Sequence, residues 1–154
     1  MTDYLEDLPD LAELVQTFSK HEVDYLVVGG HAVGFHAVPR ATKDLDLWIN
    51  PDSDNRQRVA MALEEYGAPK EIIDNLLGAE ESDIVWFGRP PNRIDFLFVL
   101  PGLRYSDAVK NVVCTESGGE KVPIIGIQDL MINKQTVARP QDLADLAALQ
   151  EVQH

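Results

Sequence analysis

The sequence predicts an α/β (α+β) fold in which one mixed β-sheet carries packed helices, all within a single domain over residues 1–154. Strand-like and helix-like hydrophobic periodicities are mixed along the whole chain, which is typical of a sheet crossed by helices. Gly and Pro residues mark the boundaries between these segments. The length suits one domain, and no repeat, low-complexity tract or linker divides the chain.

In the first half of the chain, apolar side chains recur at three- and four-residue steps in the first helix, form a buried run over 26–28 and alternate in the strand over 43–50. The glycine pair at 29–30 ends the first strand, and Pro39 ends the short helix that follows, because the residue before proline avoids helical geometry. The expected order is a helix over 4–20, a strand over 23–28, a short helix over 31–38, a strand over 43–50 and a helix over 54–66.

The second half contains two more predicted strands, a hairpin and two helices. Gly118 and Gly119 supply the hairpin turn, and Pro140 suits the first position of the last helix. Residues 105–111 are ambiguous. The expected order is a short helix over 70–77, strands over 83–87 and 93–100, hairpin strands over 112–115 and 121–125, and helices over 127–138 and 141–152.

Composition excludes some functions. Thirteen basic residues oppose 26 acidic ones, a formal charge of −13, which disfavours non-specific nucleic-acid binding and leaves room for a basic partner protein. No run approaches 18 apolar residues, so we expect no membrane span. Cys114 is the single cysteine, so no internal disulfide forms, a cytoplasmic location is the default, and we expect Cys114 to be a small core residue.

Three aspartates on predicted strands are candidate metal ligands. Asp44 and Asp46 point to the same face, with Cα atoms about 6.5–7 Å apart. That spacing lets both carboxylates reach metal ions about 3.5–4 Å apart. Asp95 adds a third acid in an otherwise apolar strand. The alternatives are ion pairs, between Arg93 and Asp95 and between the first two acids and neighbouring basic residues.

The glycine pair before the first two acids is a candidate phosphate site. Gly29 and Gly30 lead into a predicted helix that starts at His31, and backbone N–H groups at a helix N-terminus bind phosphate. The alternative interpretation is a tight strand-to-helix turn. A metal pair beside a phosphate cradle indicates phosphoryl or nucleotidyl chemistry.

Three basic residues are candidates to balance phosphate charge. Arg40 and Lys43 come just before the acid pair, and Lys134 lies on a late helix that could aim it at the cleft. Each also fits a surface ion pair. We expect the three residues Arg139, Asp142 and Asp145 to form a local network between the last two helices. Trp48 either stacks on a base or packs beneath the cleft.

Taken together, these residues resemble the nucleotidyltransferase fold of the DNA polymerase beta superfamily. The shared pattern is apolar-Gly-Gly, a gap, Asp-apolar-Asp-apolar, and a later strand Asp. The segments 28–33 and 39–47, with the tail 134–146, resemble more closely the small bacterial nucleotidyltransferases related to AbiEii- and MenT-type toxins. Many superfamily members carry Ser at the position of Gly30, where only backbone donors remain here.

The resemblance implies transfer of a nucleotide from a nucleoside triphosphate to an acceptor hydroxyl on RNA or protein, with an antitoxin as a candidate partner. Asp44 and Asp46 would hold two Mg²⁺ ions, or Mn²⁺, and Asp95 would hold the ion that activates the hydroxyl. Gly29, Gly30 and the N–H of His31 would contact the terminal phosphates. The alternative is a catalytically inactive member of the fold that serves as a nucleotide-binding or protein-interaction module.

Overall fold

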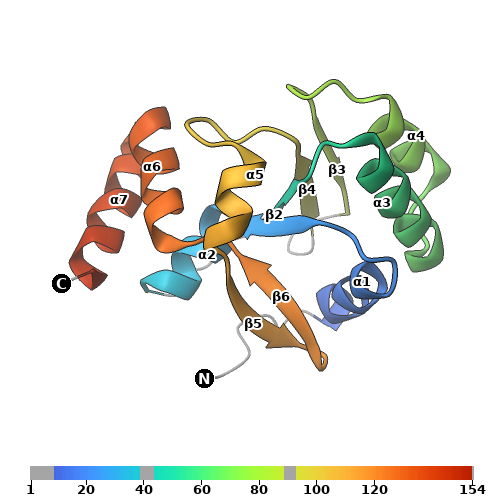
Figure 1. Ribbon diagram of the computed structural model, residues 1–154, viewed down its shortest axis with the longest axis horizontal. Helices are drawn as coiled ribbons and strands as arrows, with labels where there is room; N and C mark the ends of the chain where they lie inside the picture. The colour runs from blue at the N-terminus through green and yellow to red at the C-terminus, as the bar shows by residue number, and fades with distance from the viewer. Residues whose placement is uncertain (1–8, 39–43, 89–92, 154) are drawn as a thin grey trace.

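The structure is a computed structural model that describes residues 9–38, 44–88 and 93–153, with residues 9–11 described by their backbone alone. It shows a six-stranded mixed sheet with packed helices (Figure 1), which confirms the predicted fold class. The elements are α1 (Pro9–Lys20), β1 (Tyr25–Val28), α2 (Gly29–His36), β2 (Asp44–Ile49), α3 (Ser53–Tyr66), α4 (Lys70–Gly78), β3 (Ile84–Phe87), β4 (Arg93–Leu97), α5 (Tyr105–Ala108), the 3-10 helix η1 (Val109–Asn111), β5 (Val113–Ser117), β6 (Glu120–Ile124), α6 (Ile127–Val137) and α7 (Pro140–Val152).

The strand order in the sheet is β3-β4-β2-β1-β6-β5. β2 runs parallel to β4, and β1 runs parallel to β6, whereas the other neighbours are antiparallel. β2 therefore lies between β1 and β4, far from either edge of the sheet. Segments from three distant parts of the chain meet around it.

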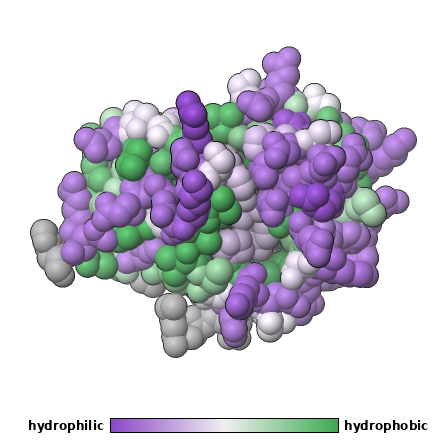
Figure 2. All heavy atoms as spheres, viewed as in Figure 1, coloured by the Kyte–Doolittle hydropathy of each residue, from purple (hydrophilic) through white to green (hydrophobic). Residues whose placement is uncertain are grey.

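One face of the sheet packs on α1, α3 and α4. Phe18 of α1 lies against Phe96 of β4, with ring centroids 6.4 Å apart, and Leu47 is the register partner of Phe96 on β2. All three side chains are buried. Figure 2 shows polar side chains over the α3 and α4 side of the molecule, as expected for helices that bury one stripe against a sheet.

The opposite face is covered in part by α5 and by the group of α2, α6 and α7. Trp48 is 1% exposed, donates its indole N–H to the Phe98 carbonyl at 3.2 Å, and meets the Tyr105 ring edge-on at 5.2 Å. Of the two alternatives for Trp48, the structure therefore shows packing. Asp44 and Asp46, on the same face nearer the start of β2, are only partly buried.

Element bounds shift by a few residues at several places, and three further differences from the sequence-based expectations concern the site and the sheet. Helix α2 begins at Gly29, within the glycine pair. β4 ends at Leu97, and the carbonyl of Phe98 accepts a hydrogen bond from Trp48. The prediction that Cys114 is a core residue is wrong, because Cys114 is exposed on β5, which lies at one edge of the sheet.

Within the described residues, no helix combines the length and the apolar character that crossing a membrane requires.

Candidate functional site

A cavity of about 690 Å³ opens where β1 ends and α6 and α7 approach the sheet. It gathers residues from β1, α2, β2, β3, β4, α6 and α7, which span most of the described sequence. Six of the residues that the sequence singled out line it: Gly29, Gly30, Asp44, Asp46, Asp95 and Lys134. The remaining candidates are His31, whose side chain is buried, and Arg40 and Lys43, which lie outside the described residues.

The register of the sheet explains why the acids meet. Asp46 and Asp95 are direct partners in the parallel pairing of β2 with β4. On its other side, Asp46 is the partner of Val28, the last residue of β1. The chain therefore turns into the glycine pair immediately beside Asp46.

Gly29 is required at this turn for two reasons. Its φ is +68°, in the left-handed region that disfavours residues with a Cβ. A Cβ at this position would also collide with Oδ2 of Asp46. The backbone of the glycine pair thus lies in contact with the Asp46 carboxyl group, and the first turn of α2 begins there.

The carboxyl group of Asp46 holds its proton unusually tightly. Burial raises its pKa from 3.8 to about 7, and the charge of Asp95, a hydrogen bond with Asp95 and the charge of Asp44 act in the same direction. Lys134 opposes this shift. When Asp46 carries a proton, its carboxyl group can donate to the Asp95 carboxylate.

Arg93 is the cation nearest to this pair. Its Nε donates to Oδ1 of Asp95 at 2.9 Å, and the guanidinium lies 4.6 Å from the centre of the Trp86 ring. The Asp95 carboxylate raises the pKa of Arg93. The ion pair between Arg93 and Asp95, one of the two alternatives for Asp95, is therefore present. Together, the side chains of Trp86, Arg93, Asp95 and Asp46 form a continuous series of contacts across β3, β4 and β2 on one face of the sheet.

Lys134 lies in a buried ionic cluster where α6 and α7 line the cavity. Its Nζ is 3.1 Å from Oδ2 of Asp145 and 3.4 Å from Oδ1 of Asp142. Arg139 Nε contacts Oδ2 of Asp142 at 2.7 Å and holds the pKa of Asp142 below its usual range. Both carboxylates are only 3% exposed, whereas Arg139 is 73% exposed. The predicted network between α6 and α7 is confirmed, with Lys134 as its centre.

His31 lies on α2 near the acids, but its side chain is 6% exposed. Burial lowers the pKa of this imidazole, and the negative charge of Asp44 opposes that shift. A neutral ring at physiological pH follows. His31 therefore contributes packing and a dipole near Asp44 in this arrangement.

The carboxylates suit a hard divalent cation by their chemistry, since Mg²⁺ prefers oxygen ligands. Their side chains, however, are engaged with one another and with Arg93. Across the described ranges, no group of three or more His, Cys, Asp or Glu side chains is positioned to hold a metal ion. Two or three carboxylates are thus at hand, but they do not form a metal cage in this arrangement.

Sequence reasoning assigned Arg139, Asp142 and Asp145 a structural role and did not place them in the site, although all three line the cavity. It also missed Asn133, which lines the cavity and donates to the Pro101 carbonyl at 3.0 Å. A usable signal existed: Pro140 joins two adjacent antiparallel helices, so residues near the end of α6 face residues near the start of α7.

No protein-family model matches the chain, and no curated protein matches it either. Among solved structures, it is similar to the crystal structure of an antigenic nucleotidyltransferase-like protein from Paracoccidioides brasiliensis. The TM-score is 0.58 at 16% sequence identity, and the match covers 96% of this chain and 76% of the other. The fold is therefore nucleotidyltransferase-like.

Proposed function

We propose that the protein is a metal-dependent nucleotidyltransferase that moves a nucleotide from a nucleoside triphosphate to an acceptor hydroxyl on RNA or protein. One observation carries the proposal. In a nucleotidyltransferase-like fold, Asp46 lies between a glycine turn and Asp95 and shares their cavity with Asp44. Phosphoryl transfer requires charge neutralisation and positioning, which such a site supplies.

Asp44, Asp46 and Asp95 would hold two Mg²⁺ ions, or Mn²⁺. When bound, such ions polarise phosphoryl oxygens and lower the pKa of an attacking hydroxyl. Metal binding requires Asp46 to lose the proton that it shares with Asp95. It also requires Asp95 to accommodate a second cation beside Arg93. Metal binding would thus release the proton held between Asp46 and Asp95.

The terminal phosphates would lie at the start of α2. There, Gly29, Gly30 and His31 would offer backbone N–H groups, and the apolar Val28 at the N-cap provides no competing side-chain acceptor. Lys134 adds positive charge that already acts on Asp46. Arg40 and Lys43 are the further candidates to balance the triphosphate.

The alternative is an inactive nucleotidyltransferase-fold protein that serves as a nucleotide-binding or protein-interaction module. The hydrogen bond between Asp46 and Asp95 and the ion pair between Arg93 and Asp95 favour it. These contacts satisfy the acids without a metal. The distinction lies in whether Mg²⁺ displaces the shared proton.

The sequence resemblance to AbiEii- and MenT-type enzymes supports a narrower proposal. In it, the protein is the toxin of a cytoplasmic toxin–antitoxin pair, and a basic antitoxin offsets its charge of −13. This proposal rests on the residues of the resemblance, and it stands or falls separately from the transfer reaction.

The test is incubation of the full chain with each labelled nucleoside triphosphate, Mg²⁺ or Mn²⁺, and total RNA or cell lysate. We expect metal-dependent transfer of label that falls at least about a hundredfold in the double variant Asp44→Asn with Asp46→Asn. The matched control is Asp52→Asn with Asp54→Asn, which removes the same charge at the same spacing from exposed positions on and before α3.

If the double variant Asp44→Asn with Asp46→Asn still transfers label, the proposed site is excluded. If no label is transferred, calorimetry with each triphosphate separates the alternatives. Triphosphate binding without turnover supports the inactive module.

A further inference from the structure

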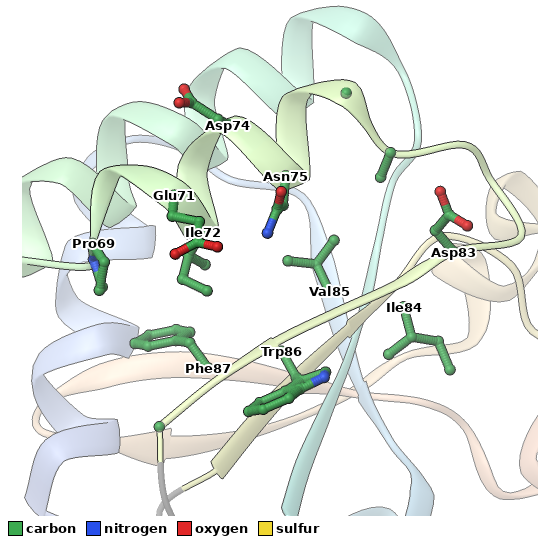
Figure 3. Close-up of a pocket in the computed structure, with 13 residues that line it drawn as sticks. Pro69, Glu71, Ile72, Asp74, Asn75, Asp83, Ile84, Val85, Trp86 and Phe87 are labelled. Atoms are coloured by element: carbon green, nitrogen blue, oxygen red, sulfur yellow. The ribbon is translucent and has the colours of Figure 1, made fainter.

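A second hollow, of about 790 Å³, lies between α4 and β3 (Figure 3). We call it the edge groove. The described residues that line it are Pro69, Glu71, Ile72, Asp74, Asn75, Gly78, Ala79, Asp83, Ile84, Val85, Trp86, Phe87 and Gly88. It adjoins the cavity of the candidate functional site, because Asp83 and Ile84 line both hollows.

The floor of the edge groove is the open edge of the sheet. β3 is the terminal strand in the strand order, and it pairs with β4 along one side only. Within the described residues, its other side has no strand partner. Such an edge presents backbone N–H and C=O groups that can pair with an added strand.

Apolar side chains flank this edge on both faces of the sheet. Val85 and Phe87 extend toward α4 and Ile72, whereas Ile84 and Trp86 extend from the other face (Figure 3). Ile84 is 57% exposed and Trp86 is 53% exposed. Large apolar side chains that remain this exposed beside an open strand edge are typical of a binding surface.

The rim of the groove is acidic. Glu71 and Asp74 project from α4, and Asp83 stands at the start of β3 (Figure 3). No lysine or arginine occurs among the described residues that line the groove. A second copy of this chain would bring the same acids and a further formal charge of −13, which disfavours pairing between two copies.

We propose that the edge groove binds a basic, extended segment of a partner protein, which adds to the sheet as a strand beside β3. Four residues of β3 span about 13 Å, so the segment supplies a strand of similar length. Side chains on one face of this strand point toward α4, where Lys or Arg stems cross Ile72 and reach Glu71 and Asp74. Side chains on the other face are apolar and cover Ile84 and Trp86.

The probe is the peptide acetyl-Lys-Val-Arg-Val-Lys-Val-Arg-amide. Its matched control has the same sequence with alternate backbone nitrogens methylated on the pairing edge, which keeps the charge and removes the hydrogen bonds. Calorimetry gives affinity, and amide chemical shifts locate binding at residues 84–87. We expect the methylated peptide to bind at least about tenfold more weakly, since two or three backbone hydrogen bonds are lost.

A charge reversal on the protein provides the second arm. We expect Glu71→Lys with Asp74→Lys to weaken the unmethylated peptide at least about tenfold. The control, Glu13→Lys with Glu151→Lys, makes the same change in net charge at exposed positions on α1 and α7, neither of which lines the groove, and should stay within about twofold.

Three outcomes would overturn the inference: equal binding of both peptides, equal effects of the two charge reversals, or amide shifts away from β3. Light scattering adds a fourth. A dimer of the free protein that the peptide does not dissociate would assign the edge to a second copy. Since the groove is tested by peptide binding and not by turnover, a failed transfer assay leaves this inference standing.

Discussion

Asp46 and Asp95 are direct partners across the parallel strands β2 and β4, and their carboxyl groups share a hydrogen bond. Two carboxyl groups can share such a bond only when one of them carries a proton. Because burial and the neighbouring carboxylates raise the pKa of Asp46 to about 7, we place that proton on Asp46. The centre of the candidate site is therefore a proton-binding position at neutral pH, and the stability of the fold depends on it.

The first prediction concerns pH and stability. An unfolded Asp titrates near 3.9, whereas Asp46 in the folded chain titrates near 7, so the folded state binds more protons between these values. The contribution of Asp46 to the free energy of unfolding is therefore full below about pH 4 and is lost as pH rises through about 7. Asp46→Asn removes this dependence. We expect the free energy of unfolding of the variant, relative to that of the wild type, to rise by on the order of 1–3 kcal/mol as the pH is raised from 4 to 8.

Urea denaturation of both proteins across this range measures the difference. Asp54→Asn, an exposed position on α3, is the control and should change stability by less than about 0.5 kcal/mol at every pH. A wild-type minus Asp46→Asn difference that does not vary with pH would show that Asp46 is ionised in the folded chain.

Replacement of Gly29 tests the contact between the glycine turn and Asp46. Gly29→Ala adds a Cβ in the left-handed region and in collision with Asp46 Oδ2, so we expect a loss of about 2–4 kcal/mol. Gly119→Ala is the matched control, because Gly119 has φ +82° and nothing within 4 Å of an added Cβ. Its loss should be about 1 kcal/mol.

A double-mutant cycle with Asp46→Ala then isolates the collision. Truncating Asp46 should recover part of the cost of Gly29→Ala, giving a coupling energy of about 1 kcal/mol or more. Additive effects of the two changes would mean that the glycine requirement comes from φ alone.

Asn55 ties the two central strands together at the end away from the site. Its Oδ1 accepts from the Asp24 N–H at 2.8 Å, and its Nδ2 donates to the carbonyls of Asp24 and Asn50, each at 2.9 Å. Because the Asn55 side chain is fully buried, Asn55→Ala should cost about 2–4 kcal/mol. Thermal unfolding measures this loss, and Asn75→Ala, at an exposed position on α4, should cost less than about 0.5 kcal/mol. Equal losses would contradict the bridging role.

Local sequence was sufficient to predict the parts of the site that are contiguous in the chain. Alternation along β2 placed Asp44 and Asp46 on one face, and the glycine pair indicated where β1 ends. Neither the partnership of Asp46 with Asp95 nor the contact of Gly29 with Asp46 could be derived in this way. Both depend on the strand order, which brings β4 and β1 to opposite sides of β2.

Side chains with more than one favourable environment were not resolved by sequence. Trp48 could stack on a ligand or pack, and the choice depended on α5 arriving over it. Cys114 follows an apolar pair that suggests a core, but β5 is an edge strand, and its position in the strand order decides exposure. Lys134 could either face the cleft or form an ion pair, and it does both: it lines the cavity, and its carboxylate partners come from the pairing of α6 with α7.

The last prediction concerns Lys134, whose ammonium group lies between two buried carboxylates. Lys134→Met replaces the ammonium group with a slightly shorter, unbranched apolar side chain and leaves Asp142 with Arg139 and Asp145 with a hydrogen bond from Gln141. The two buried carboxylates then lose the ammonium group between them, so we expect a loss of about 3–5 kcal/mol in urea denaturation at pH 7. Lys20→Met is the matched control, because Lys20 forms an exposed ion pair with Glu65 and should lose less than about 1 kcal/mol.

Neutralising the partners should reverse much of the effect of Lys134→Met. The triple variant Lys134→Met with Asp142→Asn and Asp145→Asn removes the buried negative charge, so it should be more stable than Lys134→Met alone. If the triple variant is instead less stable than the single one, the two aspartates stabilise the helix pair independently of Lys134.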